Sequence, residues 1–144
     1  MDNKNDFHTL KGYQLIGNNP ITSSMEDYLE MICRLIKTQE IVRMNELAER
    51  LNVKPSSASK MVGNLKQLGL VAFEKYGYIK PTTDGAAIGE YLLYRHEVLT
   101  NFLCFVNHSE NELEQVEKIE HFLDKRTIDN IKKLVDRLTD VLEF

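Results

Sequence analysis

Apolar residues recur at intervals of three and four positions in the segment after the first twenty residues. Positions with this spacing share one face of a helix, so the pattern predicts an amphipathic helix that begins near Ser23. Ser23 and Glu26 have the spacing of a capping box, which marks a helix start. The apolar positions of this stripe are Met25, Tyr28, Leu29, Ile32, Leu35 and Ile36. Similar patterns predict five further helices, at residues 44–51, 55–68, 83–106, 111–123 and 127–143.

A helix-turn-helix is predicted in the middle of the chain. Only a brief turn, at residues 52–53, separates the second and third predicted helices. Gly69 then ends the third helix. Two short runs of apolar and aromatic residues, at 70–75 and 78–80, lie on either side of Gly77 and predict a β-hairpin. A hairpin in this position is typical of the wing of a winged helix.

The order of these elements predicts a mainly α-helical chain with an N-terminal winged helix-turn-helix and a C-terminal helical part. A Gly-Asn-Asn-Pro run at the end of residues 1–20 separates an N-terminal extension from the rest of the chain. Residues 21–82 are expected to form the winged-helix domain, and residues 83–144 the helical domain.

Charge is distributed unevenly along the chain. The net charge is −4, yet residues 41–80 contain seven Lys and Arg and only three Asp and Glu. Residues 81–144 contain seven basic and thirteen acidic residues. A basic winged helix followed by an acidic helical part predicts one surface that meets phosphates and another that meets cations.

Composition restricts the class of protein. A hydrophobic content of 42% is ordinary for a globular chain, and no apolar run approaches the roughly 20 residues of a membrane span. Cys33 and Cys104 are isolated, which favours small core residues over a disulfide framework and indicates a reducing cytoplasm. We therefore expect a cytoplasmic protein without a membrane partner.

Six side chains that can bind metal ions stand at helical spacings. They are Asp27 and Glu30 in the first predicted helix, His96 in the fourth, and Glu117, Glu120 and His121 in the fifth. Each alone is commonly a solvated or structural residue, but residues three and four apart can direct their ligands to one side of a helix. Four carboxylates and two imidazoles without a thiolate suit Mn(II) or Fe(II) better than a structural zinc site.

The start of a recognition helix usually presents its side chains to base edges in the major groove. The residues expected there are Ser56, Ser57, Ser59 and Lys60. Because hydroxyls discriminate bases weakly, part of the specificity is expected to come from DNA shape. Expected phosphate contacts are Arg50, Lys54 and Lys66, with Lys75 and Lys80 beside the wing tip. Gly63 lies inside this helix, where glycine costs about 1 kcal/mol relative to alanine.

Four blocks carry a resemblance to a known family. They are MEDYLE at residues 25–30, KPSSASKMV at 54–62, YRHE at 94–97 and VEKIEH at 116–121. In this order and at this spacing they are similar to the diphtheria-toxin-repressor family of metal-dependent repressors, and most similar to its manganese-transport-regulator branch.

The resemblance implies a metal site, because each of the six candidate ligands falls on a ligand position of the family. It also implies two ions per subunit, bridged by carboxylates. Two divalent ions would cancel four carboxylate charges, each close pair of which otherwise costs about 3–4 kcal/mol at an effective dielectric near 20. The family's iron-sensing branch has methionine at the position of Asp27 and cysteine at that of Glu117. Both differences favour Mn(II), with Fe(II) as the alternative.

The resemblance further implies a homodimeric repressor of manganese uptake genes. Metal would bridge the first helix to the C-terminal domain, which would hold the dimer contacts and favour a DNA-competent arrangement. A two-fold dimer would read a palindromic operator in double-stranded DNA. We expect no enzymatic activity and no small organic substrate.

Two alternatives compete with this interpretation. A di-metal carboxylate enzyme in a four-helix bundle needs a Glu-x-x-His motif on each of two helices, and a helix-turn-helix occupies the middle of this chain instead. A metal-independent winged-helix regulator that senses a small molecule would keep its DNA affinity in EDTA.

Overall fold

The computed structural model describes residue 9, residues 20–73 and residues 77–142. Most of the predicted extension at residues 1–20, and Lys75 of the predicted wing, lie outside the described residues.

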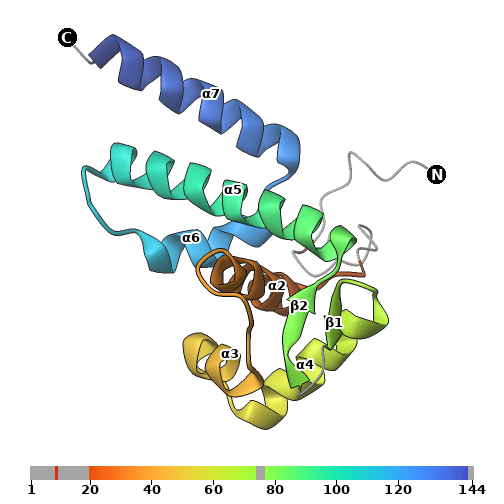
Figure 1. Ribbon diagram of the computed structural model, residues 1–144. Helices are drawn as coiled ribbons and strands as arrows, with labels where there is room; N and C mark the ends of the chain where they lie inside the picture. The colour runs from red at the N-terminus through yellow and green to blue at the C-terminus, as the bar shows by residue number, and fades with distance from the viewer. Residues whose placement is uncertain (1–8, 10–19, 74–76, 143–144) are drawn as a thin grey trace.

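Six α-helices and a two-stranded hairpin make up the described part of the chain (Figure 1). The predicted fold class, mainly α-helical with an N-terminal winged helix-turn-helix, is confirmed. The helices are α2 (Ser23–Ile36), α3 (Met44–Leu51), α4 (Pro55–Gln67), α5 (Thr83–Asn107), α6 (Leu113–Ile119) and α7 (Lys125–Leu142). One turn of 3-10 helix, η2 (Glu120–Phe122), comes directly after α6, and strands β1 (Val71–Phe73) and β2 (Ile79–Pro81) pair antiparallel.

The start of α2 differs from the prediction. Thr22, not Ser23, is the N-cap, and its side chain accepts a hydrogen bond from the backbone N–H of Met25 at 3.2 Å. Thr22 has an extended backbone whereas Ser23 is already helical, so only Thr22 can fill this role. The predicted capping box is therefore wrong. The Glu26 side chain does not cap α2 and can contact other helices instead.

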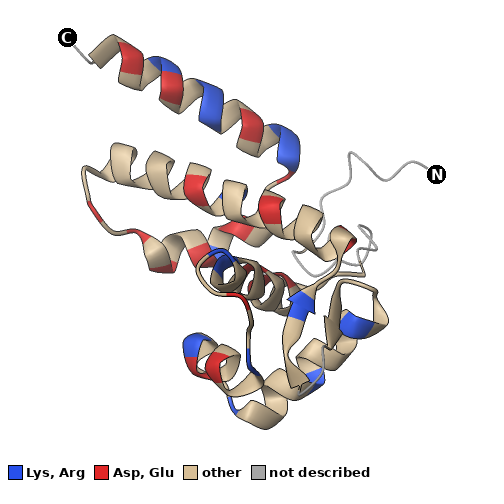
Figure 2. Cartoon of the chain, in the orientation of Figure 1, with Lys and Arg blue, Asp and Glu red and all other residues tan. Residues whose placement is uncertain are grey.

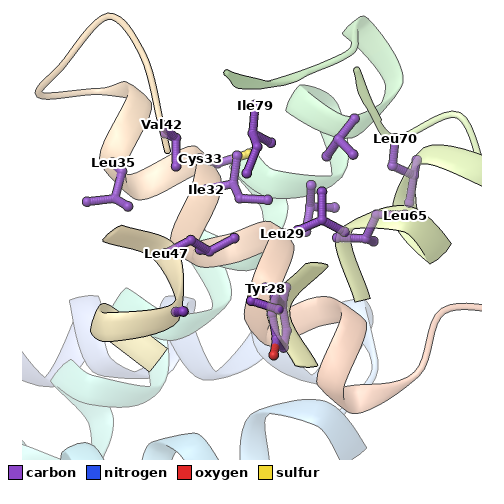
Figure 3. Packing of buried hydrophobic residues seen from close by; sticks show 14 of the residues in the cluster. Tyr28, Leu29, Ile32, Cys33, Leu35, Val42, Leu47, Leu65, Leu70 and Ile79 are labelled. Carbon is purple, nitrogen blue, oxygen red and sulfur yellow. The ribbon is translucent and has the colours of Figure 1, made fainter. Parts of the chain in front are cut away.

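The first core is built around α2. Leu29 and Ile32 of this helix are fully buried, and they pack with Leu47 of α3, Leu65 of α4 and Ile79 of β2 (Figure 3). Both helices of the helix-turn-helix and the hairpin thus share one apolar cluster with α2. Burial of such side chains stabilises the fold by about 1.5–3 kcal/mol each.

Two glycines let α5 approach this core closely. A Cβ atom at Gly89 would overlap the Cys33 side chain of α2, and one at Gly85 would overlap the backbone carbonyl of Leu70. Cys33 is buried at this contact, as a small core residue. The close packing of α2 on α5 determines how the polar edges of the two helices face each other.

A second core lies in the C-terminal half. It is formed by Val98, Leu99 and Leu103 of α5, Val116 of α6 and Ile128 of α7. Helix α7 lies along α5 at the edge of the molecule (Figure 1). Its exposed apolar residues are Leu134, Leu138, Val141 and Leu142.

The charge asymmetry of the sequence is retained in space. Figure 2 shows basic residues on α4 and the hairpin and both signs of charge on α3, whereas α5 and α6 carry mostly acidic residues. Within the described ranges, no helix combines the length and the apolar character that crossing a membrane requires.

Candidate metal centre and nucleic-acid interface

All six predicted ligands lie together, where α2 faces α5 and the segment after it. One group contains Glu30, His96, Glu117 and Glu120, and each residue offers a ligand atom within 4.8 Å of the others. A second group contains Asp27, Glu120 and His121. Glu120 belongs to both groups and is fully buried. One carboxylate therefore connects the two halves of the cluster.

The elements that supply these side chains differ in part from the prediction. Asp27 and Glu30 lie on α2, as predicted from their spacing. The predicted helix at residues 111–123 is wrong at its end, because α6 stops at Ile119 and Glu120 and His121 lie on η2. The tighter winding of a 3-10 turn changes the direction of these two side chains relative to a continued α-helix.

His96 is at the centre of the first group. Its Nδ1 atom lies 3.1 Å from Glu120 Oε2, 3.4 Å from Glu117 Oε1 and 3.7 Å from Glu30 Oε2. Three carboxylates thus converge on one imidazole nitrogen, which can donate a proton to only one of them in any ordinary geometry. The excess of negative oxygen atoms over donors favours a cation at this place.

His121 joins the second group. Its Nε2 atom lies 3.0 Å from Asp27 Oδ1 and 4.0 Å from Glu120 Oε1. Both of these carboxylate oxygens are buried, and Glu120 Oε1 has no hydrogen-bond partner among the described residues, whereas Asp27 Oδ1 has the contact with His121 Nε2. A buried carboxylate oxygen without a donor is costly, and a bound metal ion would remove that cost. The donor set and these two oxygens fit a hard divalent ion.

The carboxyl groups of Glu30 and Glu117 are held in an environment that disfavours their charge. Burial raises the pKa of Glu30 to about 7, and the neighbouring charge of Glu120 adds to this effect. Burial and Glu120 also raise the pKa of Glu117. Without a cation these groups repel one another, so a metal ion would compete with protons for them.

Both imidazoles are shifted toward their charged form. The hydrogen bond with Glu120 raises the pKa of His96. The adjoining carboxylates of Asp27 and then Glu26 raise the pKa of His121 to about 10. In the absence of metal, protons on these rings therefore supply part of the positive charge that the cluster needs.

Three further charged residues surround the cluster and were not predicted. Arg34 donates to Glu30 Oε2 at 3.0 Å, one helical turn along α2. Glu26 and the buried Arg95 form an ion pair that reaches His121 from the side opposite Asp27. The i, i+4 spacing of Glu30 and Arg34 could have indicated the first contact, but nothing local in the sequence links residues 26 and 95.

An open pocket of about 440 Å³ leads to the first group. Its walls come from both halves of the molecule, including Glu30 of α2, His96 of α5 and Glu117 of α6. Arg50 and Leu51 at the end of α3 complete it. The cluster is therefore accessible to an ion from solvent, beside the helix-turn-helix.

The predicted DNA-contacting residues that the structure describes are all exposed. Ser56, Ser57, Ser59 and Lys60 are exposed on the first turns of α4, and Ala58 between them is buried. Lys54 is the exposed N-cap of this helix, and Lys66 lies with its Nζ atom 5.1 Å from the centre of the Phe73 ring. Arg50 and Lys80 are exposed as well. The free start of α4 can thus approach another macromolecule.

Arg43 is a basic residue of this region that the sequence did not single out. It donates a hydrogen bond to the Tyr78 hydroxyl at 3.1 Å, and its guanidinium lies 5.0 Å from the centre of the ring. The adjacent bridge between Val42 and Ile79 connects the same two segments. These contacts hold the base of the wing against the start of α3.

Comparison with protein families places both halves of the chain. The N-terminal DNA-binding domain of iron-dependent repressors matches residues 20–79. The metal-binding and dimerisation domain of the same repressors matches residues 82–141. These matches agree with the resemblance carried by the four sequence blocks.

Individual relatives extend over most of the chain. The HTH-type transcriptional regulator MntR of Oceanobacillus iheyensis is 42% identical over 120 residues, which is 83% of this chain and 82% of that protein. The regulator of the same name from Geobacillus thermodenitrificans is 44% identical over 115 residues, 79% of this chain and 82% of that protein.

Solved structures share the fold. The manganese regulator SloR aligns with a TM-score of 0.68 at 26% identity, over 78% of this chain and 53% of that one. A manganese-dependent transcriptional repressor in complex with manganese aligns with a TM-score of 0.67 at 28% identity, over 78% and 52%. This chain spans about half the length of these solved chains.

Proposed function

Since this chain belongs to the iron-dependent repressor family, we propose that it binds Mn(II) at the cluster around Glu120 and then represses transcription as a homodimer. The family consists of DNA-binding regulators, so the chain is not an enzyme, and the di-metal carboxylate enzyme is set aside.

The observation that carries the proposal is the position of Glu120. It is fully buried, it belongs to both groups of candidate ligands, and its Oε1 atom has no hydrogen-bond donor among the described residues. A bridging carboxylate between two ions would use both of its oxygens. We therefore assign two ions per subunit, with ligands Asp27, Glu30, His96, Glu117, Glu120 and His121.

Mn(II) is the ion that the donor set favours. It is hard and accepts oxygen and nitrogen ligands, and the six residues offer only these. The solved neighbours named as manganese regulators support the same choice. Fe(II) accepts a similar set, and availability in the cell also decides which ion is bound. The expected output, by analogy with the family, is repression of manganese uptake genes in the cytoplasm.

Metal binding would connect the two halves of the chain. Asp27 and Glu30 lie on α2, which is the centre of the first core, whereas the other ligands lie on α5, α6 and η2. We propose residues 21–82 and 83–144 as two domains, linked through this cluster. An ion that holds both together restricts their relative motion and raises the population of one arrangement.

DNA would be contacted by the exposed face of α4. Ser56, Ser57, Ser59 and Lys60 would lie in the major groove, and Lys54, Lys66 and Lys75 would contact phosphates. In a homodimer with two-fold symmetry, two such helices would read the half-sites of a palindromic operator.

A DNA-binding titration tests the proposal. Fluorescence anisotropy would follow a duplex that carries the upstream region of a manganese uptake gene from the same genome, with a scrambled duplex as control. We expect binding with Mn(II), weaker anaerobic binding with Fe(II), and none with EDTA. Equal affinity in Mn(II) and EDTA would instead establish a metal-independent regulator, and stronger activation by Fe(II) would overturn the assignment of manganese.

A further inference from the structure

A buried ion pair joins α2 to α5 directly beside the metal centre. Arg95 Nη1 lies 3.3 Å from Glu26 Oε2, and Arg95 Nη2 lies 3.4 Å from Glu26 Oε1. The side chain of Arg95 is 4% exposed and that of Glu26 16%. Two parallel contacts between a guanidinium and a carboxylate fix the orientation of both groups.

Glu26 also fixes one nitrogen of His121. Its Oε1 atom lies 2.8 Å from His121 Nδ1, a hydrogen-bond distance. The other ring nitrogen, Nε2, faces Asp27 at 3.0 Å. When Nδ1–H donates to Glu26, the ring is held with Nε2 toward the second group of ligands, where it can bind a metal ion.

The three neighbouring acids Glu26, Asp27 and Glu120 differ in what their oxygens contact. Both oxygens of Glu26 are engaged, by Arg95 and His121. In contrast, Glu120 Oε1 is buried without a hydrogen bond in the described part of the protein, and buried Asp27 Oδ1 has the contact with the metal-facing nitrogen Nε2 of His121. Glu26 is therefore suited to orient a ligand, whereas the other two are suited to be ligands.

We propose that Glu26 and Arg95 are positioning residues for the metal site formed by Asp27, Glu120 and His121. Glu26 holds the His121 ring through Nδ1, and Arg95 holds Glu26 through its buried guanidinium. This rests on the proposed function, because it requires a metal ion at that group. The proposal predicts that the binding of one of the two metal ions depends on the Glu26–Arg95 pair, although neither residue is a metal ligand.

Counting Mn(II) tests this directly. Electron paramagnetic resonance of free Mn(II) would give affinity and stoichiometry for the wild type, Glu26→Ala and Glu26→Gln. We expect about a 100-fold weaker affinity for one of the two ions in Glu26→Ala and about a tenfold loss in Glu26→Gln, which keeps an acceptor oxygen. The other ion should bind nearly as in the wild type.

Glu90→Ala is the matched control. Glu90 and Lys37 form another ion pair between α5 and α2, at 3.2 Å, with side chains 64% and 52% exposed. It joins the same two helices away from the six candidate ligands, so its loss should leave both Mn(II) affinities unchanged. If Glu90→Ala weakened Mn(II) binding as much as Glu26→Ala does, any ion pair between α2 and α5 would matter for the metal site. That result would overturn the positioning role of Glu26.

A double-mutant cycle separates positioning from general stability. If Glu26 acts through His121, then Glu26→Ala should cause no further loss of Mn(II) affinity in a His121→Ala background. Additive losses would overturn the proposal. Circular dichroism of the metal-free variants checks the fold, and Glu26→Gln, nearly the same shape, decides the question if Glu26→Ala does not fold.

The two proposals fail in different ways. Wild-type Mn(II) affinities in both Glu26 variants would overturn the positioning role, even if Mn(II) still activated DNA binding. DNA binding by the wild type that is unaffected by Mn(II) would overturn the repressor mechanism, and Mn(II) counting on Glu26→Gln would still decide the role of Glu26.

Discussion

The metal cluster and the exposed start of α4 differ in how far the protein itself fixes their side chains. Glu120 is fully buried, and each of its neighbours in the cluster touches another charged group. The side chains of Ser56, Ser57 and Lys60 are exposed and form no hydrogen bond or ion pair within the described residues. The geometry of the cluster is thus complete in the folded chain, whereas that of α4 is completed by a partner. Substitutions in the cluster should therefore have large effects on Mn(II) affinity that depend on one another. Substitutions on α4 should have small effects on DNA affinity that add up.

Glu120→Gln is the strongest test of this contrast. The substitution keeps the shape but removes the charge shared by both ligand groups, so we expect both Mn(II) affinities to fall by more than about 100-fold and metal-activated DNA binding to disappear. The melting temperature of the metal-free protein should not fall, because the repulsion with Glu30 and Glu117 is relieved. Mn(II) counting, anisotropy and thermal unfolding measure the three effects.

Glu114→Gln is the control for this substitution. Glu114 lies on α6 with its side chain 84% exposed and pairs with Lys118. It should behave as the wild type in all three measurements. Retention of both ions by Glu120→Gln would mean that Glu120 is not a bridging ligand, and the cluster would lose its central residue.

Local spacing predicted most of the cluster. Asp27 and Glu30 face the site because positions three apart share a helix face. Glu117, Glu120 and His121 reach it as well, although the continuous helix expected for them is interrupted by η2. The ligand prediction used only the closeness of these residues in sequence. It therefore still brought them together although Glu120 and His121 lie on a 3-10 turn and not on an α-helix.

The Glu26–Arg95 pair could not be predicted in the same way. The two residues are 69 positions apart, and they meet because Gly85 and Gly89 let α5 pack closely on the first core. The local pattern favoured a capping role for Glu26 instead. Contacts between helices depend on packing, which periodicity within one helix does not describe.

Mn(II) affinity should increase with pH, because the ion displaces protons from the cluster. The pKa of Glu30 is raised to about 7 from an ordinary 4.5, and that of His121 to about 10 from 6.5. Each proton displaced makes the affinity about tenfold higher per pH unit. Calorimetry of Mn(II) binding in two buffers with different ionisation enthalpies, between pH 6 and 8, would count the protons. Binding without proton release would contradict these assignments.

The same pKa shifts determine whether the stability of the metal-free protein rises or falls with pH. Both groups bind protons more tightly when folded, so their contribution to stability is fully present below the unfolded-state pKa. For Glu30 it is lost as the pH rises from about 4.5 through 7, and for His121 as it rises from about 6.5 through 10. Urea unfolding of the metal-free protein should therefore show stability declining from pH 5 to pH 8, and saturating Mn(II) should oppose that decline.

Substitutions on α4 should have smaller, additive effects on DNA affinity. Lys60→Ala removes one exposed cation, so DNA affinity should fall several-fold and the slope of log affinity against log salt should decrease by about 0.9. Mn(II) binding should not change. Lys118→Ala, an exposed lysine of α6 that pairs with Glu114, is the control and should leave DNA binding intact. An unchanged salt slope in Lys60→Ala would place the phosphate contacts elsewhere on the domain.

The smallest effect concerns the backbone of the same helix. A Cβ atom at Gly63 would meet nothing within 4 Å, so Gly63→Ala should raise the free energy of unfolding by up to about 1 kcal/mol. At Gly69 a Cβ is equally free of contacts, but φ is +75°, so Gly69→Ala should lower stability by about 1 kcal/mol instead. Urea unfolding of the two variants separates backbone preference from packing.

DNA binding by Gly63→Ala then shows whether the glycine has a role at the duplex. If Gly63→Ala is more stable but binds DNA less well, with Mn(II) affinity unchanged, the glycine allows close approach of α4 to the duplex. If DNA affinity is also unchanged, Gly63 only weakens the helix, and position 63 does not lie against the duplex.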